Sequence, residues 1–265
     1  MKLDIYHIDA FAEQMFQGNP AAVCVLDDWL PDAIMQAIAM EINLSETAFV
    51  VRRKDGDFRI RWFTPKTEAS LCGHATLAAA HVLYTHLAFP DEPIRFHSLS
   101  GPLVAFRDDF GVCLDFPVQS AEPIVPTDAM AQAINCIPEE AYAGEDLVLM
   151  LNDASQVAIL EPNFAALAEL PYRGICVSAL DHGQPYDFVC RFFAPAVGIN
   201  EDPVTGSAFT KLALLYALKL GKTDFRARQV SPRGGDVQVS LQGNRVFISG
   251  RALTAMCGSM TLPGF

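Results

Sequence analysis

The sequence predicts an α+β protein built from two copies of one unit, with strands wrapped around a central buried helix in each copy. Two observations carry this prediction: a faint internal repeat, and an apolar, helix-like run at the equivalent place in each repeat. A third supports it. Of the 265 residues, 51% are hydrophobic and 19% are charged, which supplies a sizeable core and argues against disorder.

The repeat consists of four short segments that recur in the same order, offset by about 130 residues. Arg61–Pro65 matches Arg191–Pro195, and Cys72–Ala75 matches Thr205–Ala208. In the third pair, Gly101 followed by Leu103–Ala105 matches Gly234 followed by Val237–Val239. The fourth pair, Asn19–Val23 and Asp153–Val157, matches less closely. Each match alone is weak, but four in order at a nearly constant offset indicate duplication of one supersecondary unit.

The first half is predicted to form strands around the first central helix. Residues 74–86 are apolar on nearly every side, which is typical of a buried helix. The elements expected before it are strands at Ile5–Phe11 and Ala21–Leu26, a helix from Pro31 to Ile42, and a hairpin formed by Thr47–Arg52 and Phe58–Phe63. More strands are expected from Ile94 to Phe116.

The boundary between the halves is predicted at a proline-rich segment. Pro117–Pro126 has three prolines and little apolar periodicity, as expected of a linker. We therefore expect an N-terminal lobe of residues 1–116, which the last strand (252–265) could join, and a C-terminal lobe of residues 117–251. The second central helix is expected near 207–220, with Gly221 as its C-terminal stop.

Charge and cysteine usage exclude several classes of protein. The net charge is −12 and no run of Lys and Arg offsets it, so a nucleic-acid partner is not expected. An anionic substrate would need helix N-termini or individual basic residues. The apolar runs are too short for a membrane span, and the first residues have no apolar stretch of the kind expected of a signal peptide. Seven cysteines without a CxxC pair suggest reduced thiols in a cytoplasmic protein.

The most informative candidates for a binding site are two equivalent glycines, Gly73 and Gly206, each just before a central helix. A helix N-terminus presents unpaired N–H groups, so two such ends facing each other could hold a carboxylate or a developing enolate. Alternatively, each glycine only permits a tight turn. Their recurrence in both halves favours the binding role.

Three other residues are candidates for acid–base chemistry or substrate contact. Glu46 lies between an apolar helix and an apolar strand, and partial burial would make it a usable proton shuttle; otherwise it is an exposed loop acid or a helix cap. His74 is either a proton donor or orienting partner, or a helix cap. Asp202 either orients a substrate hydroxyl or amine, or forms an Asp-Pro turn.

Other catalytic patterns are missing or incomplete in the sequence. Thiol racemases need one thiol on each face of the substrate carbon, and Cys72 has Thr205 as its equivalent, so a two-thiol mechanism is excluded. No HExxH, zinc-spaced Cys/His, GxGxxG, GxxxxGK[ST] or GxSxG pattern occurs.

Six segments, in order along most of the chain, resemble the phenazine-biosynthesis F-type (PhzF-like) isomerases, which share the diaminopimelate epimerase fold. Ser45–Phe49 (SETAF) and Cys72–Thr76 (CGHAT) together are highly specific for that family. The matching segments are Gly18–Val23, Leu44–Phe49, Arg61–Pro65, Leu71–Thr76, Asp115–Pro117 and Glu201–Ala208.

The resemblance implies two pseudo-symmetric lobes, each a mostly antiparallel sheet around a helix, with the active site between them. It also implies a homodimer and neither metal nor organic cofactor. Carried over to this chain, Glu46 takes a proton from one carbon and returns it to another, while His74 and Asp202 contact the substrate and assist. Gly73, Gly206 and Ser207 would hold a carboxylate or polarised oxygen. Cys72 and Thr205, which adjoin the glycines, complete the expected substrate-binding set.

The expected function is therefore isomerisation of a small cyclic or hydroxylated carboxylic or amino acid by intramolecular proton transfer. Two alternatives remain open. One is a dehydratase or lyase on the same fold, with Cys72 as the base and Thr205 in place of a second thiol. The other is a non-catalytic binding protein that keeps the fold.

Overall fold

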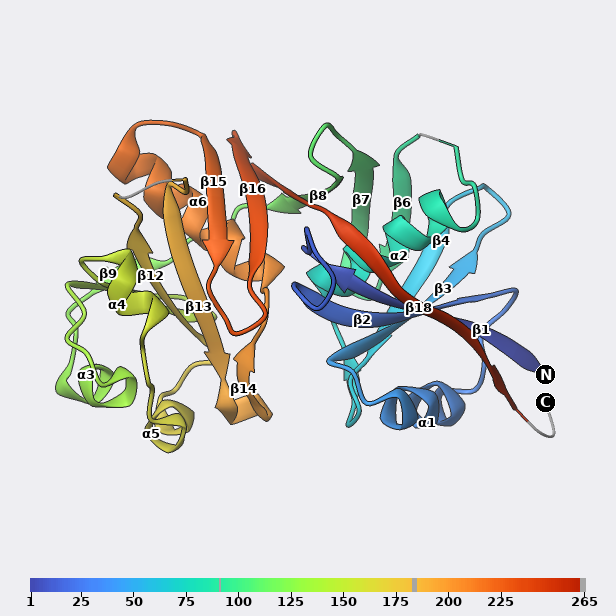
Figure 1. Ribbon diagram of the computed structural model, residues 1–265, viewed down its shortest axis with the longest axis horizontal. Coiled ribbons are helices and arrows are strands. Elements are labelled where there is room, and N and C mark those ends of the chain that lie inside the picture. Colours follow the sequence, from blue (N-terminus) through green and yellow to red (C-terminus); the bar gives the residue numbers. More distant parts are fainter. Residues whose placement is uncertain (91, 183–184, 263–265) are drawn as a thin grey trace. The chain divides into compact units, whose positions relative to one another are not determined.

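The computed structural model describes residues 1–90, 92–182 and 185–262, and its chain divides into two units (Figure 1). Unit 1 comprises Met1–Phe116 and Ser249–Phe265, and unit 2 comprises Pro117–Ile248. The last three residues of the expected final strand, 263–265, lie outside the described residues.

Unit 1 consists of strands arranged around one nearly fully buried helix, α2. Its elements are β1 (Lys2–Ala10), β2 (Asn19–Leu26), α1 (Asp32–Ile42), β3 (Glu46–Arg52), β4 (Phe58–Phe63), β5 (Glu68–Ala69), α2 (Gly73–Thr85), β6 (Ile94–Ser98), β7 (Gly101–Arg107), β8 (Val112–Pro117) and β18 (Ala252–Thr261). Most strand pairs are antiparallel, but β2 runs parallel to β3, and β4 runs parallel to β6. The chain's last strand, β18, pairs with its first, β1.

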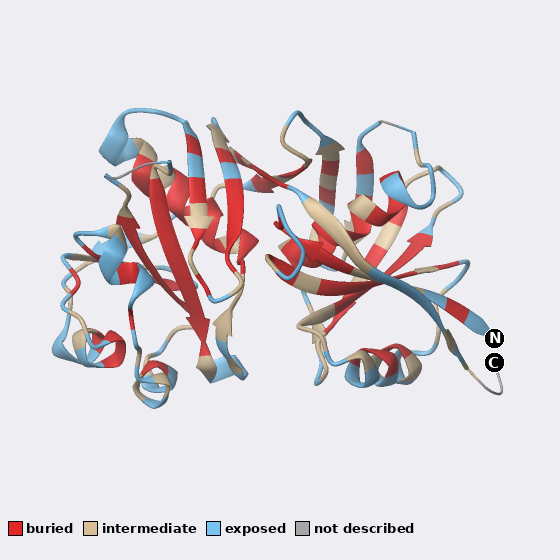
Figure 2. Cartoon of the chain, viewed as in Figure 1, coloured by how far each residue is buried: buried red, intermediate tan, exposed pale blue. Residues whose placement is uncertain are grey.

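Unit 2 has its own central helix, α6. Its elements are β9 (Glu122–Ile124), α3 (Asp128–Ile134), β10 (Glu140–Ala143), β11 (Leu147–Met150), α4 (Ala154–Ala158), α5 (Phe164–Glu169), β12 (Ile175–Leu180), β13 (Phe188–Ala194), η1 (Pro195–Val197), β14 (Ile199–Asp202), α6 (Gly206–Leu220), β15 (Asp224–Gln229), β16 (Gly235–Gln242) and β17 (Arg245–Gly250). Most residues of both central helices are buried (Figure 2), which explains why neither shows a polar face in the sequence.

The two units share one order of strand pairings. In unit 1, β2 is parallel to β3, β3 is antiparallel to β4, β4 is antiparallel to β5 and parallel to β6, and β6 is antiparallel to β7. In unit 2, the strands β11, β12, β13, β14, β15 and β16 repeat this order pair by pair. The internal repeat seen in the sequence is therefore a repeat of structure.

The best-conserved segment of the repeat is explained by an ion pair and a stacked ring. Arg61 on β4 binds Glu68 on β5, and Arg191 on β13 binds Glu201 on β14, with 2.7 Å from Nε to Oε1 in both cases. Each guanidinium also lies over the phenylalanine two residues on, 5.1 Å from the Phe63 ring centroid and 5.0 Å from that of Phe193. A planar guanidinium suits both partners at once.

Two expectations from the sequence need correction. Asn19–Val23 belongs to β2, whereas Asp153–Val157 contains the N-cap and most of helix α4, so that fourth match is not structural. The strand equivalent to β2 is β11, as the pairing order shows. The expected linker also contains a short strand, β9, which pairs with β10. Its prolines did not exclude a strand, because proline is tolerated in edge strands.

The local elements otherwise follow the expected signals. The helix after Pro31 and the hairpin of β3 and β4 are present, and Gly221 ends α6 in the left-handed conformation, at φ 66°. All seven cysteines are free. No helix in the described part of the chain is long and apolar enough to cross a membrane.

Candidate active site

The candidate site of unit 1 forms where three elements begin: β2, β3 and α2. Because β2 and β3 are parallel neighbours, with Ala21 opposite Glu46, their first residues lie at the same edge of the sheet. Helix α2 contacts both strands and starts at this edge. Asn19, Glu46, Cys72 and His74 are thereby brought together from three separate segments.

The start of α2 is shaped so that two of its side chains face Glu46. Cys72 is the N-cap in an extended conformation, with φ −144° and ψ 112°, and its side chain makes no capping hydrogen bond. Its carbonyl oxygen instead accepts a hydrogen bond of 2.6 Å from the Thr76 hydroxyl. His74 is the second residue of the helix, so the alternative role of helix cap does not apply to it.

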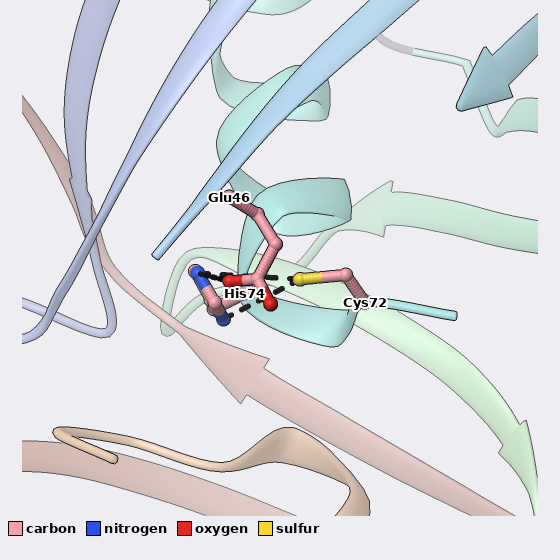
Figure 3. A group of neighbouring side chains, drawn as sticks. All are labelled: Glu46, Cys72 and His74. Carbon is pink, nitrogen blue, oxygen red and sulfur yellow. Dashed lines mark hydrogen bonds and ion pairs between the residues drawn. The ribbon is translucent and has the colours of Figure 1, made fainter. Parts of the chain in front are cut away.

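Three side chains point toward one another at this place (Figure 3). Nε2 of His74 lies 3.2 Å from Oε2 of Glu46, and the Cys72 sulfur lies 3.5 Å from Nδ1 of His74. The Glu46 side chain is only 13% exposed, which rules out the exposed loop acid considered above. A partly buried carboxylate beside an imidazole is compatible with acid–base chemistry.

The surroundings shift the pKa values of both His74 and Cys72. Burial by itself would lower the pKa of His74, but the neighbouring Cys72 and Glu46 outweigh burial and raise this pKa well above its usual value. Burial and the nearby Glu46 raise the pKa of Cys72, so that side chain is a neutral thiol near pH 7.

Asn19 is a site residue that the sequence reasoning missed. It is fully buried, and its side-chain amide nitrogen lies 3.2 Å from Nδ1 of His74, on the side of the ring away from Glu46. The hydroxyl of Ser45, next to Glu46, donates to its amide oxygen at 3.5 Å. The signal was available, because Asn19 lies in one of the segments that resemble the PhzF-like family and a fully buried Asn needs polar partners.

The same cluster has the composition of a metal site. Glu46, Cys72 and His74 each offer one ligand atom, and these three atoms lie within 4.8 Å of one another. Carboxylate oxygen, thiolate sulfur and imidazole nitrogen are all ligands of zinc.

The remaining candidates lie together in unit 2, at the start of α6. The Thr205 hydroxyl donates to Oδ2 of Asp202 at 2.5 Å. Gln229 fixes both residues, because its side-chain oxygen accepts from the Thr205 N–H at 2.8 Å and its amide nitrogen donates to the Asp202 carbonyl at 2.6 Å. Asp202 is the last residue of β14, so its side chain is held beside the first turn of α6, next to Gly206 and Ser207.

The two helix-start glycines do not owe their identity to backbone strain. Neither Gly73 nor Gly206 is among the described residues that have a positive φ. Positive φ is therefore not the reason for glycine at either position, and the alternative of a tight turn stays open. What both glycines do provide is a helix start without a side chain.

Arg173 is a second residue that the sequence did not single out. Its guanidinium binds the buried Asp146 through two hydrogen bonds of 2.9 and 2.7 Å, and one of its nitrogens lies 3.4 Å from the Ser207 hydroxyl. Its side chain remains 41% exposed. An individual basic residue beside a helix N-terminus is what an anionic substrate of this acidic chain would need.

The family and class of the protein follow from comparison with known proteins. The family model described as "Phenazine biosynthesis-like protein" matches residues 8–258. The chain therefore belongs to the phenazine biosynthesis-like (PhzC-PhzF) family, and the family predicted from the sequence motifs is confirmed.

Relatives and solved structures agree with this assignment. An uncharacterized isomerase of Pseudomonas aeruginosa is 48% identical over 262 residues, which are 99% of this chain and all of the relative. The crystal structure of a PhzF-family protein of Enterococcus faecalis has a TM-score of 0.96 and 44% identity, covering 99% of this chain and all of the other. The predicted fold class and the isomerase class are thereby confirmed.

A more distant likeness concerns the fold alone. A hydroxyproline epimerase from Agrobacterium vitis, solved with bound trans-4-hydroxy-L-proline, has a TM-score of 0.63 at 12% identity and covers 97% of this chain and 92% of its own. The fold is thus shared with a protein of only 12% sequence identity.

Proposed function

We propose that this isomerase moves a proton between two carbons of a small cyclic or hydroxylated carboxylic or amino acid, with Glu46 as the acid–base group and without a metal or organic cofactor. The observation that carries the proposal is the Glu46 carboxylate, 13% exposed and 3.2 Å from His74. A partly buried carboxylate can take up a proton from one carbon of the substrate and deliver it to another.

The steps balance without any oxidant or reductant. The Glu46 carboxylate removes a proton from an acidic carbon, and the electron pair of the broken C–H bond moves into the adjacent π system of the substrate. The resulting carboxylic acid then gives its proton to a second carbon of that π system, which restores the carboxylate. His74 stabilises negative charge on Glu46 before and after the transfer, and Cys72 and Asn19 hold the imidazole ring.

Substrate contacts are proposed for both units. In unit 1, Gly73 leaves the N–H groups at the start of α2 open to a carboxylate or polarised oxygen. In unit 2, Gly206 and Ser207 offer the start of α6, with the Arg173 guanidinium beside the Ser207 hydroxyl. Asp202, whose carboxylate is positioned by Thr205, is proposed to accept a hydrogen bond from a substrate hydroxyl or amine.

The proposal is tested by isotope exchange in deuterated water. The enzyme is incubated with cyclic hydroxylated amino acids, a dihydro-hydroxyanthranilate among them, and loss or migration of substrate hydrogen is followed by NMR. Glu46→Gln keeps the shape of the side chain but removes the base, and exchange should stop while circular dichroism stays unchanged. Glu41→Gln, an exposed acid of α1, is the matched control. Full exchange by the Glu46 variant would exclude it as the base.

The lyase alternative, with Cys72 as the base, has weaker support. The Cys72 sulfur does lie 3.5 Å from Nδ1 of His74, but burial and Glu46 raise the pKa of that thiol, which disfavours the thiolate a base would need. The Thr205 hydroxyl, moreover, donates to Asp202. Elimination of water or ammonia from the substrate by the wild-type chain, lost in Cys72→Ala, would restore this alternative.

A further inference from the structure

The cluster at the start of α2 also has a property that proton transfer does not use. Among the described residues, Glu46, Cys72 and His74 form a group of nitrogen, oxygen and sulfur ligand atoms that all lie within 4.8 Å of one another. Cys72 and His74 are two residues apart, but Glu46 lies 26 residues before Cys72. The sequence therefore shows no zinc-binding spacing.

We propose that Glu46, Cys72 and His74 bind one Zn²⁺ ion and that the bound ion reversibly inhibits the enzyme. Binding concerns the three side chains alone, whereas the inhibition rests on the proposed role of Glu46 as the acid–base group. The ion is thus an inhibitor that competes for a catalytic residue and not a cofactor of the reaction.

The distances within the cluster suit a tetrahedral ion. With zinc about 2.0–2.1 Å from nitrogen or oxygen and about 2.3 Å from sulfur, neighbouring ligand atoms lie roughly 3.3–3.6 Å apart. Nε2 of His74 is 3.2 Å from Oε2 of Glu46 and 4.0 Å from the Cys72 sulfur. Both separations are within about 0.5 Å of these lengths. The third pair, the Glu46 oxygen and the Cys72 sulfur, lies within 4.8 Å.

The Glu46 oxygen that faces His74 has lone pairs that no hydrogen bond uses. Oε2 is inaccessible to solvent and has no aligned hydrogen bond from the described residues, although it lies at ion-pair distance from His74. A buried carboxylate oxygen with unused lone pairs is costly unless a positive partner reaches it. A divalent ion satisfies this oxygen more completely than the misaligned imidazole does.

Asn19 supplies the outer support that zinc-binding histidines usually have. With Nε2 on the metal, the neutral imidazole carries its hydrogen on Nδ1 and needs an acceptor there. The Asn19 side-chain amide already lies 3.2 Å from Nδ1, and a half-turn about its last bond presents the oxygen in place of the nitrogen.

Chemically, binding exchanges protons for the metal. The Cys72 thiol gives up its proton to the buffer, as does His74 when both of its ring nitrogens carry hydrogen, and no residue changes oxidation state. Three protein ligands leave the fourth position of a tetrahedral zinc for water or for the carboxylate of a small ligand. Because the ion occupies Glu46, that carboxylate can no longer accept a proton from substrate carbon.

The test is a titration of the intact chain with Zn²⁺ by calorimetry and with Co²⁺ by absorption spectroscopy. We expect one ion per chain, and a sulfur-to-cobalt charge-transfer band together with the intense visible bands of tetrahedral Co²⁺. Glu46→Gln, Cys72→Ala and His74→Ala should each weaken binding by roughly tenfold or more. Cys257→Ser, which removes the exposed thiol of β18, should leave binding unchanged.

Several outcomes would overturn the proposal. No binding, a cobalt complex of the wild-type chain without a sulfur band, or loss of binding in Cys257→Ser would each do so, and none of these depends on whether the three site variants fold. Circular dichroism shows whether a variant that loses binding is still folded. Cys72→Ser removes the thiol but nearly keeps the shape of the side chain, so it should fold and still lose binding.

Inhibition is measured in the isotope-exchange assay. Exchange should fall as Zn²⁺ saturates the site and return when a chelator removes the ion. If zinc binds as expected but Glu46→Gln still exchanges fully, the proposed function fails and the zinc site stands. If exchange needs Glu46 but zinc does not bind, the zinc site fails alone.

Discussion

The two units share their strand pairings, yet they place different chemistry at equivalent positions. Thr47 lies opposite Phe63 in unit 1, and Ile175 lies opposite Phe193 in unit 2, so these two residues are equivalent. The residues just before them, Glu46 and Gly174, are therefore also equivalent. Duplication therefore provided two equivalent places for an acid, and only unit 1 has one.

Packing explains why unit 2 carries no acid at this place. A Cβ atom on Gly174 would lie 2.3 Å from the ring of Phe192, far inside contact distance. Phe192 takes the position that Trp62 has in unit 1. In unit 2 the Phe192 ring thus occupies the space into which a side chain at position 174 would extend.

Unit 2 has instead a buried ion cluster where unit 1 is apolar or neutral. Lys211 and Asp146 are both almost fully buried and lie 2.8 Å apart, and Asp146 also binds Arg173. The equivalent residues of unit 1 are Ala78, Ala21 and Ser45, by the strand register and by their distance from the helix N-caps. One scaffold therefore holds a buried carboxylate beside an imidazole in unit 1 and an anchored cation in unit 2.

The largest expected effect tests whether the acid belongs to unit 1 alone. Glu46→Gln should lower the exchange rate by about 10²–10⁴-fold, because the side chain can no longer take up a proton. Asp202→Asn, at the start of α6, should mainly raise KM, since it is proposed to contact the substrate without accepting the transferred proton. Equal losses of kcat in both variants would contradict this division, and steady-state kinetics measures it.

The second effect is on stability and uses the buried ion cluster. Lys211→Ala copies unit 1 but leaves Asp146 with one cation fewer, so we expect a loss of about 3–5 kcal/mol in the free energy of unfolding. Lys222→Ala removes a lysine whose side chain is 44% exposed and should change stability by less than about 1 kcal/mol. Urea unfolding measures both, and equal losses would show that the buried lysine has no special role.

The third effect is a pH dependence confined to unit 1. Burial lowers the pKa of His81 on α2 to about 4, with smaller contributions from His86 and Arg107. The unfolded chain therefore binds this proton more readily, and stability should fall as the pH drops from about 6.5 to about 4, by up to about 3 kcal/mol. Below that range the contribution stays constant.

The control for this prediction copies unit 2, which has Leu214 at the equivalent place in α6. His81→Leu has no proton to take up and should flatten this part of the curve of unfolding free energy against pH. A variant with the same acid-induced loss as the wild-type chain would assign the loss to other groups.

The smallest effect concerns Gly174. Gly174→Ala should cost about 1–3 kcal/mol, because the added methyl group overlaps the Phe192 ring and that ring must shift. Gly258→Ala, in β18, is the matched control, because its new methyl group would meet nothing within 4 Å. Thermal unfolding compares the two, and an equally stable Gly174 variant would show that the ring packing does not exclude a side chain there.

Much of this protein could be predicted from local patterns. The helix after Pro31, the hairpin of β3 and β4 and the glycine stop at Gly221 follow from turn chemistry and periodicity, which act over a few residues. Glu46, Cys72 and His74 were named from short motifs, and the structure places them in one cluster. The strand β9 was not predicted, and the match of Asp153–Val157 with Asn19–Val23 was wrong. Local patterns do not show which segments pair in a sheet.

By itself the sequence determined the duplication, the two central helices and the family, since each is encoded in the order and spacing of residues along the chain. Only the tertiary structure decided what the polar residues do. It placed Asn19 against His74, gave Arg173 a buried carboxylate as its anchor, and put a phenylalanine ring where Gly174 would otherwise carry a side chain. The physical reason is that burial, pKa and ligand geometry depend on neighbours in space, and those neighbours come from separate strands and helices.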